Sequence, residues 1–349
     1  MTDKNTGQKP VVWGVLGASH FALMAAIPAM QQAPLVELRA LASRSLDKAK
    51  QAAASANVAH AYGSYEELLS DPEIEAIYNP LPNHLHVAWS IKAARAGKHV
   101  LCEKPIAMNA GEAQELARVA HETGKLIGEA FMVRHHPQWE LVVNLIQSGR
   151  IGQVRAVQTA FSYSNSDLHN IRNQKDKGGG ALYDIGGYAI NTARLIFGKE
   201  PTRVAGMAAR DPNSGCDSLT SAILDFGTGQ ANFVVGTQHV PYQRVHIFGT
   251  RGHLEVEIPF NPPHHRPCKI YVDDGFVGAP DFSVETSSDD RREVLTTPPA
   301  NHYTRQWQAF SEAIRSGKPI QNDMHSAVAN MRVIDAIFRA LDSQRWEPV

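Results

Sequence analysis

The chain has 349 residues, of which 43% are hydrophobic and 20% charged, and its formal net charge is -1. This length accommodates two domains with buried cores, and the composition is that of a globular rather than a disordered chain. Because the chain has no basic surplus, we expect neither nucleic acid nor an anionic membrane as a partner.

Short apolar segments and helical segments alternate over the first 130 residues. Strands are predicted at 11–16, 36–42, 76–78, 99–102 and 126–130, and helices at 21–32, 46–56, 65–69, 86–96 and 110–122. This alternation predicts a parallel sheet with helices on both faces. The right-handed crossover rule then restricts the topology to the doubly wound, or Rossmann, type, which we assign to residues 1–130.

The apolar stretch from residue 11 to 30 has two interpretations. Two lysines precede it, as in a signal peptide. However, Gly14, Gly17, Ser19 and His20 interrupt it, and these residues suit a phosphate-binding loop. No other segment approaches the ~20 apolar residues of a membrane span. The three cysteines, an odd and low number, fit a reducing compartment, so we expect a cytoplasmic protein.

The pattern changes after residue 130. Helices are predicted at 136–148 and 178–197, followed by two closing helices at 304–316 and 326–343. Strands are predicted at 154–162, 202–208, 218–225, 230–237, 242–249, 252–258 and 268–272, joined by short Gly/Pro turns. The segment 274–299 is polar and is predicted to be loop with at most one edge strand. Residues 131–349 are therefore predicted to form an α/β domain with an open, mostly antiparallel sheet.

The loop after the first predicted strand is rich in small residues. Gly14 and Gly17 let the backbone approach a pyrophosphate, and the following helix offers free N–H groups. The G-x-G-x-x-G spacing is not intact, since its second glycine falls on Ser19. A tight turn without a ligand is therefore the alternative interpretation.

The end of the second strand indicates the cofactor. An NAD site carries an acidic residue there to bind the ribose 2′-hydroxyl. Here Glu37 lies near the strand's start, and Ser43 and Arg44 follow its end. Since Arg44 can pair with a 2′-phosphate, we predict NADP, with NAD as the weaker alternative. A solvated surface arginine is the other interpretation of Arg44.

Three segments together resemble the glucose–fructose oxidoreductase / inositol dehydrogenase (Gfo/Idh/MocA) family. They are the loop around Gly17, the pair of segments 79–86 and 102–105, and the segment 178–188. The resemblance implies a Rossmann domain and a second domain for substrate binding and oligomerisation. It also implies a cis peptide between Lys104 and Pro105, and a homodimer or homotetramer formed through the free face of the C-terminal sheet.

Within the family, the segments 80–86, 167–172 and 252–259 look most like NADP-dependent D-xylose dehydrogenases and dimeric dihydrodiol dehydrogenases. The resemblance implies oxidation of an aldose such as D-xylose at C1 to its lactone. The alternatives are reduction of a keto-sugar or nucleotide-linked keto-sugar with NADPH, and an NADP-binding sensor or regulator without turnover.

Hydride transfer to or from a hydroxyl carbon needs a partner that moves the hydroxyl proton. Tyr188 can do so if a nearby ammonium lowers its pKa, and Lys104 is the candidate because it follows a strand end. The resemblance supports both roles. Asp184, one helical turn before Tyr188, is expected to orient substrate or catalytic side chains, or only to balance the helix dipole. A core tyrosine with a satisfied hydroxyl is the alternative for Tyr188.

Asn83 and His86 either contact the ribose and nicotinamide or only start a helix. The complete predicted cofactor set is Gly14, Gly17, Ala18, Ser19, His20, Phe21, Ser43, Arg44, Pro80, Leu81, Asn83, His86, Glu103 and Lys104. Arg172 and His302 are predicted to contact the carbohydrate substrate. The histidine pairs 135–136 and 264–265 lack a convergent carboxylate, so no metal site is predicted.

Overall fold

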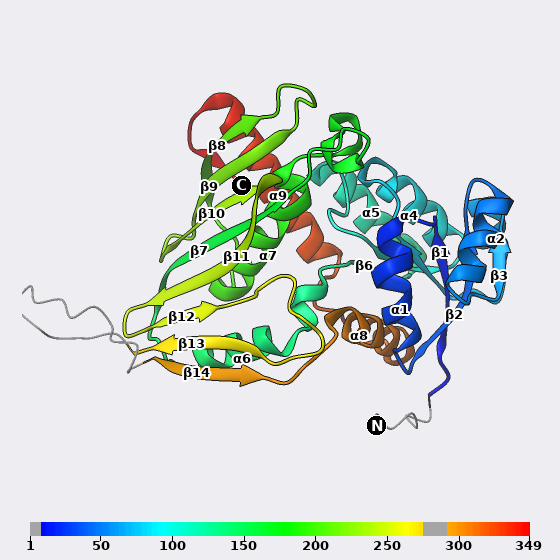
Figure 1. The fold of residues 1–349 in the computed structure, drawn as a ribbon, viewed down its shortest axis with the longest axis horizontal. Helices are drawn as coiled ribbons and strands as arrows, with labels where there is room; N and C mark the ends of the chain where they lie inside the picture. Colours follow the sequence, from blue (N-terminus) through cyan, green and yellow to red (C-terminus); the bar gives the residue numbers. More distant parts are fainter. Residues whose placement is uncertain (1–7, 275–291) are drawn as a thin grey trace, which may run out of the picture. The chain divides into compact units, whose positions relative to one another are not determined.

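A computed structural model describes residues 8–274 and 292–349 and divides into two compact units (Figure 1). The first unit comprises the chain up to Arg134 together with Asn301–Met331. The second comprises His135–Ala300 and Arg332–Val349. These units follow from contacts alone, so the functional division predicted between residues 130 and 131 stays a prediction.

The sheet of the first unit has the strand order β3-β2-β1-β4-β5-β6, and every neighbouring pair is parallel. Its strands are β1 (Val11–Leu16), β2 (Val36–Ala42), β3 (His60–Tyr62), β4 (Ala76–Asn79), β5 (His99–Cys102) and β6 (Ile127–Glu129). The predicted Rossmann topology is confirmed. Sequence periodicity missed β3, because a three-residue edge strand is too short to show alternation.

The helices of this unit are α1 (Ile27–Gln31), α2 (Leu46–Ser55), α3 (Tyr65–Ser70), α4 (His86–Arg95), α5 (Ala110–Thr123) and α8 (His302–Ser316). A wide π turn, Ala22–Ala26, precedes α1 within the predicted helix 21–32. Helix α5 ends at Gly124, whose φ of 64° suits a glycine cap.

Helix α8 packs against the sheet of the first unit, although it follows β1 by almost 300 residues. The ring of Trp307 lies edge-on to Trp13 and to Tyr78, with centroids 5.3 and 4.8 Å apart. The indole nitrogen of Trp13 donates to Ser311 Oγ at 3.2 Å. Arg315 binds both carboxylate oxygens of Glu75. The core of this unit is therefore completed by a late segment of the chain.

In the described chain, the sheet of the second unit has the order β14-β13-β12-β11-β7-β10-β9-β8-β15. Its strands are β7 (Val154–Ser164), β8 (Arg203–Arg210), β9 (Asp217–Asp225), β10 (Gln230–Gly236), β11 (Gln238–Gly249), β12 (His253–Val256), β13 (Cys268–Asp273), β14 (Glu293–Thr297) and β15 (Glu347–Pro348). The β7–β10 pair is parallel and the others are antiparallel, which confirms the predicted mostly antiparallel sheet. The predicted edge strand in 274–299 corresponds to β14, and residues 275–291 lie outside the described residues.

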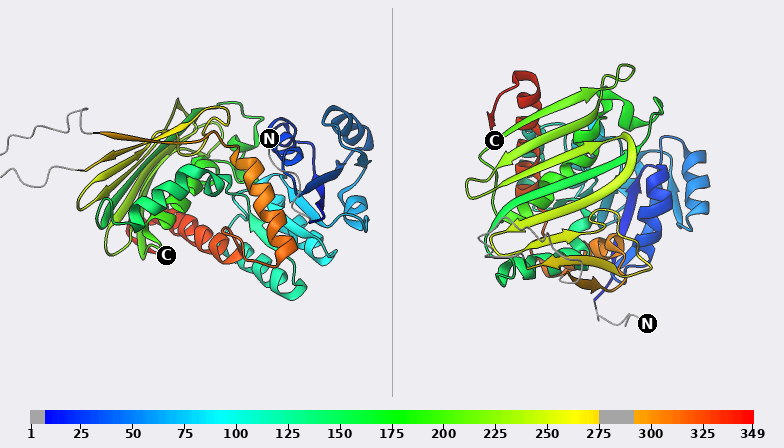
Figure 2. Two further views of the ribbon diagram at one scale, coloured as in Figure 1. Left: turned by 90° about the horizontal axis from the view of Figure 1, so that it is seen from below. Right: turned by 60° about the vertical axis from the view of Figure 1, so that its left-hand side comes forward.

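Helices α6 (Pro137–Gln147) and α7 (Gly187–Phe197) cover one face of this sheet (Figure 2). The long helix α9 (Met324–Ser343) begins in the first unit and ends in the second. On the sheet's other face, apolar side chains are exposed, including Met207 at 74% and Val234 at 43%. A hollow of about 590 Å³ opens on that face. None of the helices in the described residues has the length and apolar character needed to cross a membrane.

Candidate active site

Gly17 makes the turn between β1 and the first helix. Its φ is +88°, a conformation that favours glycine, and a Cβ there would lie 3.1 Å from a methyl group of Leu81. Its N–H donates to the carbonyl of Ala42, and Ser19 Oγ accepts from the N–H of Ala22 at 3.1 Å. Gly14 instead gives room to Leu68, whose methyl would lie 2.8 Å from an added Cβ. Glycine is thus required at Gly17 for its backbone conformation and at Gly14 for the space that Leu68 occupies.

A pocket of about 540 Å³ lies beside this turn in the first unit. It brings together seven residues of the predicted cofactor set: Gly17, Ala18, Ser19, Ser43, Arg44, Pro80 and Leu81. Lys48 and Tyr65 also line it and were not predicted. Lys48 lies in the first turn of α2, whose N-cap Ser45 directly follows Arg44.

The charge pattern of this pocket suits an anion. Among the described residues that line it, Arg44 and Lys48 are exposed cations and none is a carboxylate. Glu37 lies at the start of β2, where its carboxylate accepts a hydrogen bond from Arg39 at 2.8 Å. The acid with the expected spacing is therefore engaged elsewhere, and a guanidinium and an ammonium stand at the strand's carboxyl end.

Asn79 shapes the segment that follows β4. Its side-chain oxygen accepts from the N–H of Leu81 at 3.3 Å, and its nitrogen donates to the carbonyl of His86 and to Ser90 Oγ, both at 3.0 Å. Asn79 is fully buried. Sequence reasoning did not single out this role, which depends on partners brought together by the start of α4.

His86 joins two loops through its ring nitrogens. Nδ1 lies 2.7 Å from the carbonyl oxygen of Pro105, and Nε2 lies 2.6 Å from that of Leu81. Burial lowers the pKa of this imidazole to about 4, and Lys104 contributes in the same direction. The neutral imidazole can donate to only one of these two carbonyl oxygens at a time. Because both ring nitrogens face the backbone of the protein, the geometry favours an indirect role for His86 at a cofactor site. Asn83 begins a short 3-10 turn, Asn83–Leu85.

The loop carrying Lys104 is held from two sides. Its peptide bond to Pro105 is cis, as the resemblance implied. Glu103 accepts from the hydroxyl of Tyr78 at 2.8 Å and from the N–H of Lys104 at 3.3 Å. The buried carboxylate of Glu129 accepts from the N–H of Ile106 at 2.9 Å. Lys104 thus sits on a defined loop at the carboxyl end of β5.

Three consecutive glycines precede the helix that carries Tyr188. A Cβ on Gly179 would lie 2.6 Å from the carbonyl oxygen of Arg172. Gly180 has a φ of +123°, and its Cβ would lie 2.0 Å from a carboxylate oxygen of Asp217. Asp217 is 3% exposed and accepts from the N–H of Leu182 at 2.8 Å and from Thr220 Oγ1 at 2.6 Å. Burial raises the pKa of Asp217 despite these bonds.

Asp217 therefore caps the first turn of this helix from β9. That turn is a π turn, Leu182–Gly186, so α7 begins later than the predicted helix start at residue 178. The widened turn and the glycine run leave space for a side chain from 35 residues further along. Because the signal for Asp217 is a spatial one, the local sequence did not reveal it.

Tyr188 lies on α7 and is 6% exposed. Its ring centroid is 5.9 Å from that of Phe161 and 5.6 Å from that of Phe260. Asp184 lies in the preceding π turn, where its carboxylate accepts from Tyr163 at 2.6 Å and from Arg172 at 3.2 Å. Within the second unit, the structure thus brings together Asp184 and Arg172 of the predicted set and adds Tyr163.

The remaining predicted residues lie in the first unit. His20 is exposed, and Phe21 packs edge-on against Tyr303 with centroids 5.8 Å apart. His302 begins α8, is 4% exposed and stacks edge-on with Tyr303 at 4.6 Å. His302 and Arg172, both predicted to contact substrate, thus belong to different units.

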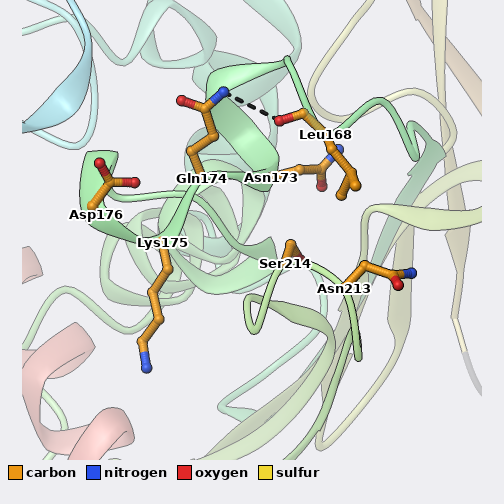
Figure 3. Close-up of a pocket in the computed structure, with 7 residues that line it drawn as sticks. All are labelled: Leu168, Asn173, Gln174, Lys175, Asp176, Asn213 and Ser214. Atoms are coloured by element: carbon orange, nitrogen blue, oxygen red, sulfur yellow. Dashed lines mark hydrogen bonds between the residues drawn. The ribbon is translucent and has the colours of Figure 1, made fainter.

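A second hollow, of about 660 Å³, lies in the second unit next to the loop of Arg172 (Figure 3). Its lining residues are Leu168, Asn173, Gln174, Lys175, Asp176, Asn213 and Ser214. The amide nitrogen of Gln174 donates to the carbonyl of Leu168 at 3.2 Å, which ties the loop to itself. Among the residues that the structure describes, no group of three or more His, Cys, Asp or Glu is placed to hold a metal ion.

A Rossmann unit with a phosphate-type loop, together with a unit built on an open sheet, is typical of nucleotide-dependent oxidoreductases. The chain belongs to the Gfo/Idh/MocA oxidoreductase family. Residues 11–131 match the family described as an oxidoreductase family with an NAD-binding Rossmann fold, and residues 139–255 match its C-terminal domain. The family resemblance seen in the sequence is confirmed.

Relatives along nearly the whole chain include sugar-acting enzymes. A D-xylose 1-dehydrogenase (NADP+) of Haloferax volcanii is 34% identical and covers 95% of this chain and 98% of its own. A dTDP-3,4-didehydro-2,6-dideoxy-α-D-glucose 3-reductase of Streptomyces violaceoruber is 36% identical over 94% of each chain. The crystal structure of a 3-ketoreductase from Actinomadura kijaniata with NADP and TDP-benzene has a TM-score of 0.86 and 30% identity, covering 95% and 98% of the two chains.

Proposed function

We propose that this protein is an NADP-dependent oxidoreductase that transfers a hydride between the nicotinamide and a sugar. Reduction of a nucleotide-linked keto-sugar is the favoured reaction, and oxidation of an aldose at C1 is the second candidate. The observation that carries this order is the likeness, at a TM-score of 0.86, to a 3-ketoreductase bound to NADP and TDP-benzene. The resemblance found in the sequence favours aldose oxidation, so this likeness reverses the order of the two reactions. Aldose oxidation stays the second candidate because a D-xylose 1-dehydrogenase is among the relatives.

The pocket beside Gly17 fits NADP. The glycine turn lets backbone N–H groups approach a pyrophosphate, and Arg44 with Lys48 provides positive charge for a 2′-phosphate. A carboxylate at this position would repel that phosphate, and the described lining contains none. Ser43 can donate a hydrogen bond to the same group. NAD, which lacks the 2′-phosphate, gains nothing from these cations.

Bound NADPH supplies the hydride for reduction, and NADP accepts it in the reverse direction. Tyr188 is assigned the proton: its hydroxyl donates to the substrate carbonyl oxygen during reduction, and its phenolate accepts the hydroxyl proton during oxidation. Lys104 is assigned the role of the cation that lowers the pKa of Tyr188, so that its phenolate forms near neutral pH. Asp184 orients Tyr188 and its neighbours. Arg172 and His302 are the proposed substrate contacts.

The other residues of the predicted cofactor set receive supporting roles. Gly14 permits tight packing beneath the loop, while Ala18, Ser19, His20 and Phe21 form the loop's continuation into the helix. Pro80 and Leu81 form a wall of the pocket. Glu103 and His86 hold the loop around Lys104, and Asn83 begins the turn that leads into α4.

The test is a substrate panel followed by NADPH absorbance, with the wild type, Y188F, K104M and the matched control Y271F. The favoured reaction predicts turnover of dTDP-linked keto-sugars, and losses of about 10²–10⁴ in kcat/KM for Y188F and K104M. NADPH affinity should remain within about twofold in Y188F, because the proposed role is proton transfer. Turnover of free pentoses alone would favour the second candidate. Tight NADPH binding without turnover on either class would favour a sensor.

The open face of the second unit's sheet is the proposed self-association surface. Large apolar side chains, Met207, Ile223, Val234 and Tyr242, are exposed around its hollow. A contiguous apolar face on a sheet is typical of protein–protein contact. We therefore keep a homodimer or homotetramer, formed by pairing of this face with a second copy, as the proposed assembly.

A further inference from the structure

One carboxylate oxygen of Asp184 receives two donors from other segments. Tyr163, near the end of β7, donates its hydroxyl to Oδ2 at 2.6 Å. Arg172 donates Nε to the same oxygen at 3.2 Å. The side chain of Asp184 is 12% exposed and that of Arg172 is 40% exposed, so the shared carboxylate oxygen is shielded from most water while the guanidinium is partly solvated. Such charge-assisted bonds hold their partners more firmly than neutral ones do.

The backbone of Arg172 is already fixed to the start of the same helix. Its carbonyl accepts from the N–H of Gly180 at 2.9 Å, and its N–H donates to the side-chain oxygen of Asn170 at 3.1 Å. The direction of the arginine side chain is the remaining freedom. Asp184 sets that direction by holding Nε, and Tyr163 in turn fixes the carboxylate that does so.

The arginine charge acts on Tyr188 as well as on Asp184. The carboxylate of Asp184 first, and Tyr188 also, raise the pKa of Arg172. Electrostatic interaction is reciprocal, so the guanidinium favours the ionised form of Tyr188. Arg172, which belongs to the same unit as Tyr188, is therefore a second cation that can stabilise the phenolate of Tyr188, in addition to the role proposed for Lys104.

Tyr163 itself remains a hydrogen-bond donor. Burial first, and then the charge of Asp184, raises the pKa of Tyr163 above its ordinary value. Its phenol therefore stays protonated wherever the enzyme works, and it holds Asp184 without exchanging a proton with substrate. A phenylalanine at this position would keep the ring and remove this one bond.

We propose that Tyr163 is a positioning residue: through Asp184 it holds Arg172 where the guanidinium charge favours the phenolate of Tyr188. The inference rests on the proposed role of Tyr188 in proton transfer. Without the hydroxyl of Tyr163, the guanidinium loses its fixed place and the Asp184 charge is less compensated. Both changes disfavour the phenolate, so they act in the same direction.

The experiment titrates Tyr188 directly in protein labelled with 13Cζ-tyrosine, with Y188F used to assign the signal. In Y163F the midpoint of the Tyr188 titration should rise by about 0.5–1 pH unit. This is less than the shift of about 1–3 pH units that an opposite charge in direct contact causes. R172Q should raise it at least as far, and R172K should restore most of the loss. The control Y271F removes the hydroxyl that donates to Glu257 at 3.1 Å and should leave the midpoint unchanged. The acid limb of kcat for alcohol oxidation should move with the midpoint in each variant.

An unchanged Tyr188 midpoint in Y163F, or an equal rise in Y271F, would overturn the proposal. If Y163F does not fold, R172Q and R172K decide, and identical midpoints in these two would overturn it. Full turnover in Y188F would instead refute the proposed function, because the titration is measured without substrate and reports only the electrostatic network.

Discussion

Removing the positive charge of Arg44 should weaken NADPH binding and leave NADH binding unchanged. Arg44 and Lys48 line the pocket beside the phosphate turn, and both are exposed to solvent. Two unit charges about 4 Å apart near a protein surface attract by roughly 4 kcal/mol before desolvation and screening are counted. Exposed pairs retain much less, so we expect about 1–1.5 kcal/mol for the contact between Arg44 and a 2′-phosphate.

This free energy corresponds to an approximately tenfold rise in the NADPH Kd for R44A, because about 1.4 kcal/mol is tenfold. The double variant R44A/K48A should lose roughly another fivefold, since the two cations share one phosphate and their effects are not additive. Fluorescence titration with NADPH and NADH measures both constants on the same protein. Raised salt should reduce the difference between wild type and R44A, because these charges are exposed.

NADH is the internal control, because it lacks only the phosphate. Equal losses for NADPH and NADH in R44A would mean that the arginine supports the loop rather than the phosphate. An unchanged NADPH Kd would make Arg44 a solvated surface residue. Either result would remove the physical basis for the NADP preference.

Three further predictions concern stability and assembly. G180A should lower the unfolding temperature far more than G198A. Both glycines have positive φ, but only at Gly180 would an added Cβ meet a carboxylate. Similar melting curves for the two variants would refute this reason. The pKa of His86 is about 4 when folded and about 6.5 when unfolded, so His86 contributes stability above pH 6.5 that is lost as pH falls toward 4, by about 3 kcal/mol in full. H86Q should flatten this part of a curve of unfolding free energy against pH, and an unchanged slope would contradict this reason. M207E should shift light-scattering mass toward the monomer if the open sheet face pairs two copies, and an unchanged mass would place the interface elsewhere.

Much of the fold could be predicted from the sequence, because its signals are local. Apolar runs with caps located the strands and helices of the Rossmann sheet, and the order of strand types indicated the antiparallel sheet. What escaped depends on contacts between distant segments. Helix α8 packs on β1 through Trp307 and Trp13, and no pattern within either segment reveals the other.

In the candidate site, too, residues with a local sequence signal could be predicted and residues that depend on distant contacts could not. Motifs marked Gly17, Arg44 and the segments around Lys104 and Tyr188, since glycine turns and charged strand ends have a local reason. The side chains that hold these segments, Asn79 and Asp217, are ordinary polar residues in sequence. Their importance follows from burial and from partners that only the folded chain brings together.

The late completion of the first unit has a consequence for synthesis on the ribosome. Residues 8–134 emerge long before α8, so the face of the sheet that holds Trp13 and Tyr78 waits uncovered while more than 160 further residues are made. A fragment ending before Asn301 would keep that aromatic surface exposed and prone to aggregation. A minimal cofactor-binding protein cut from this chain would therefore need residues 301–331 joined back by a linker.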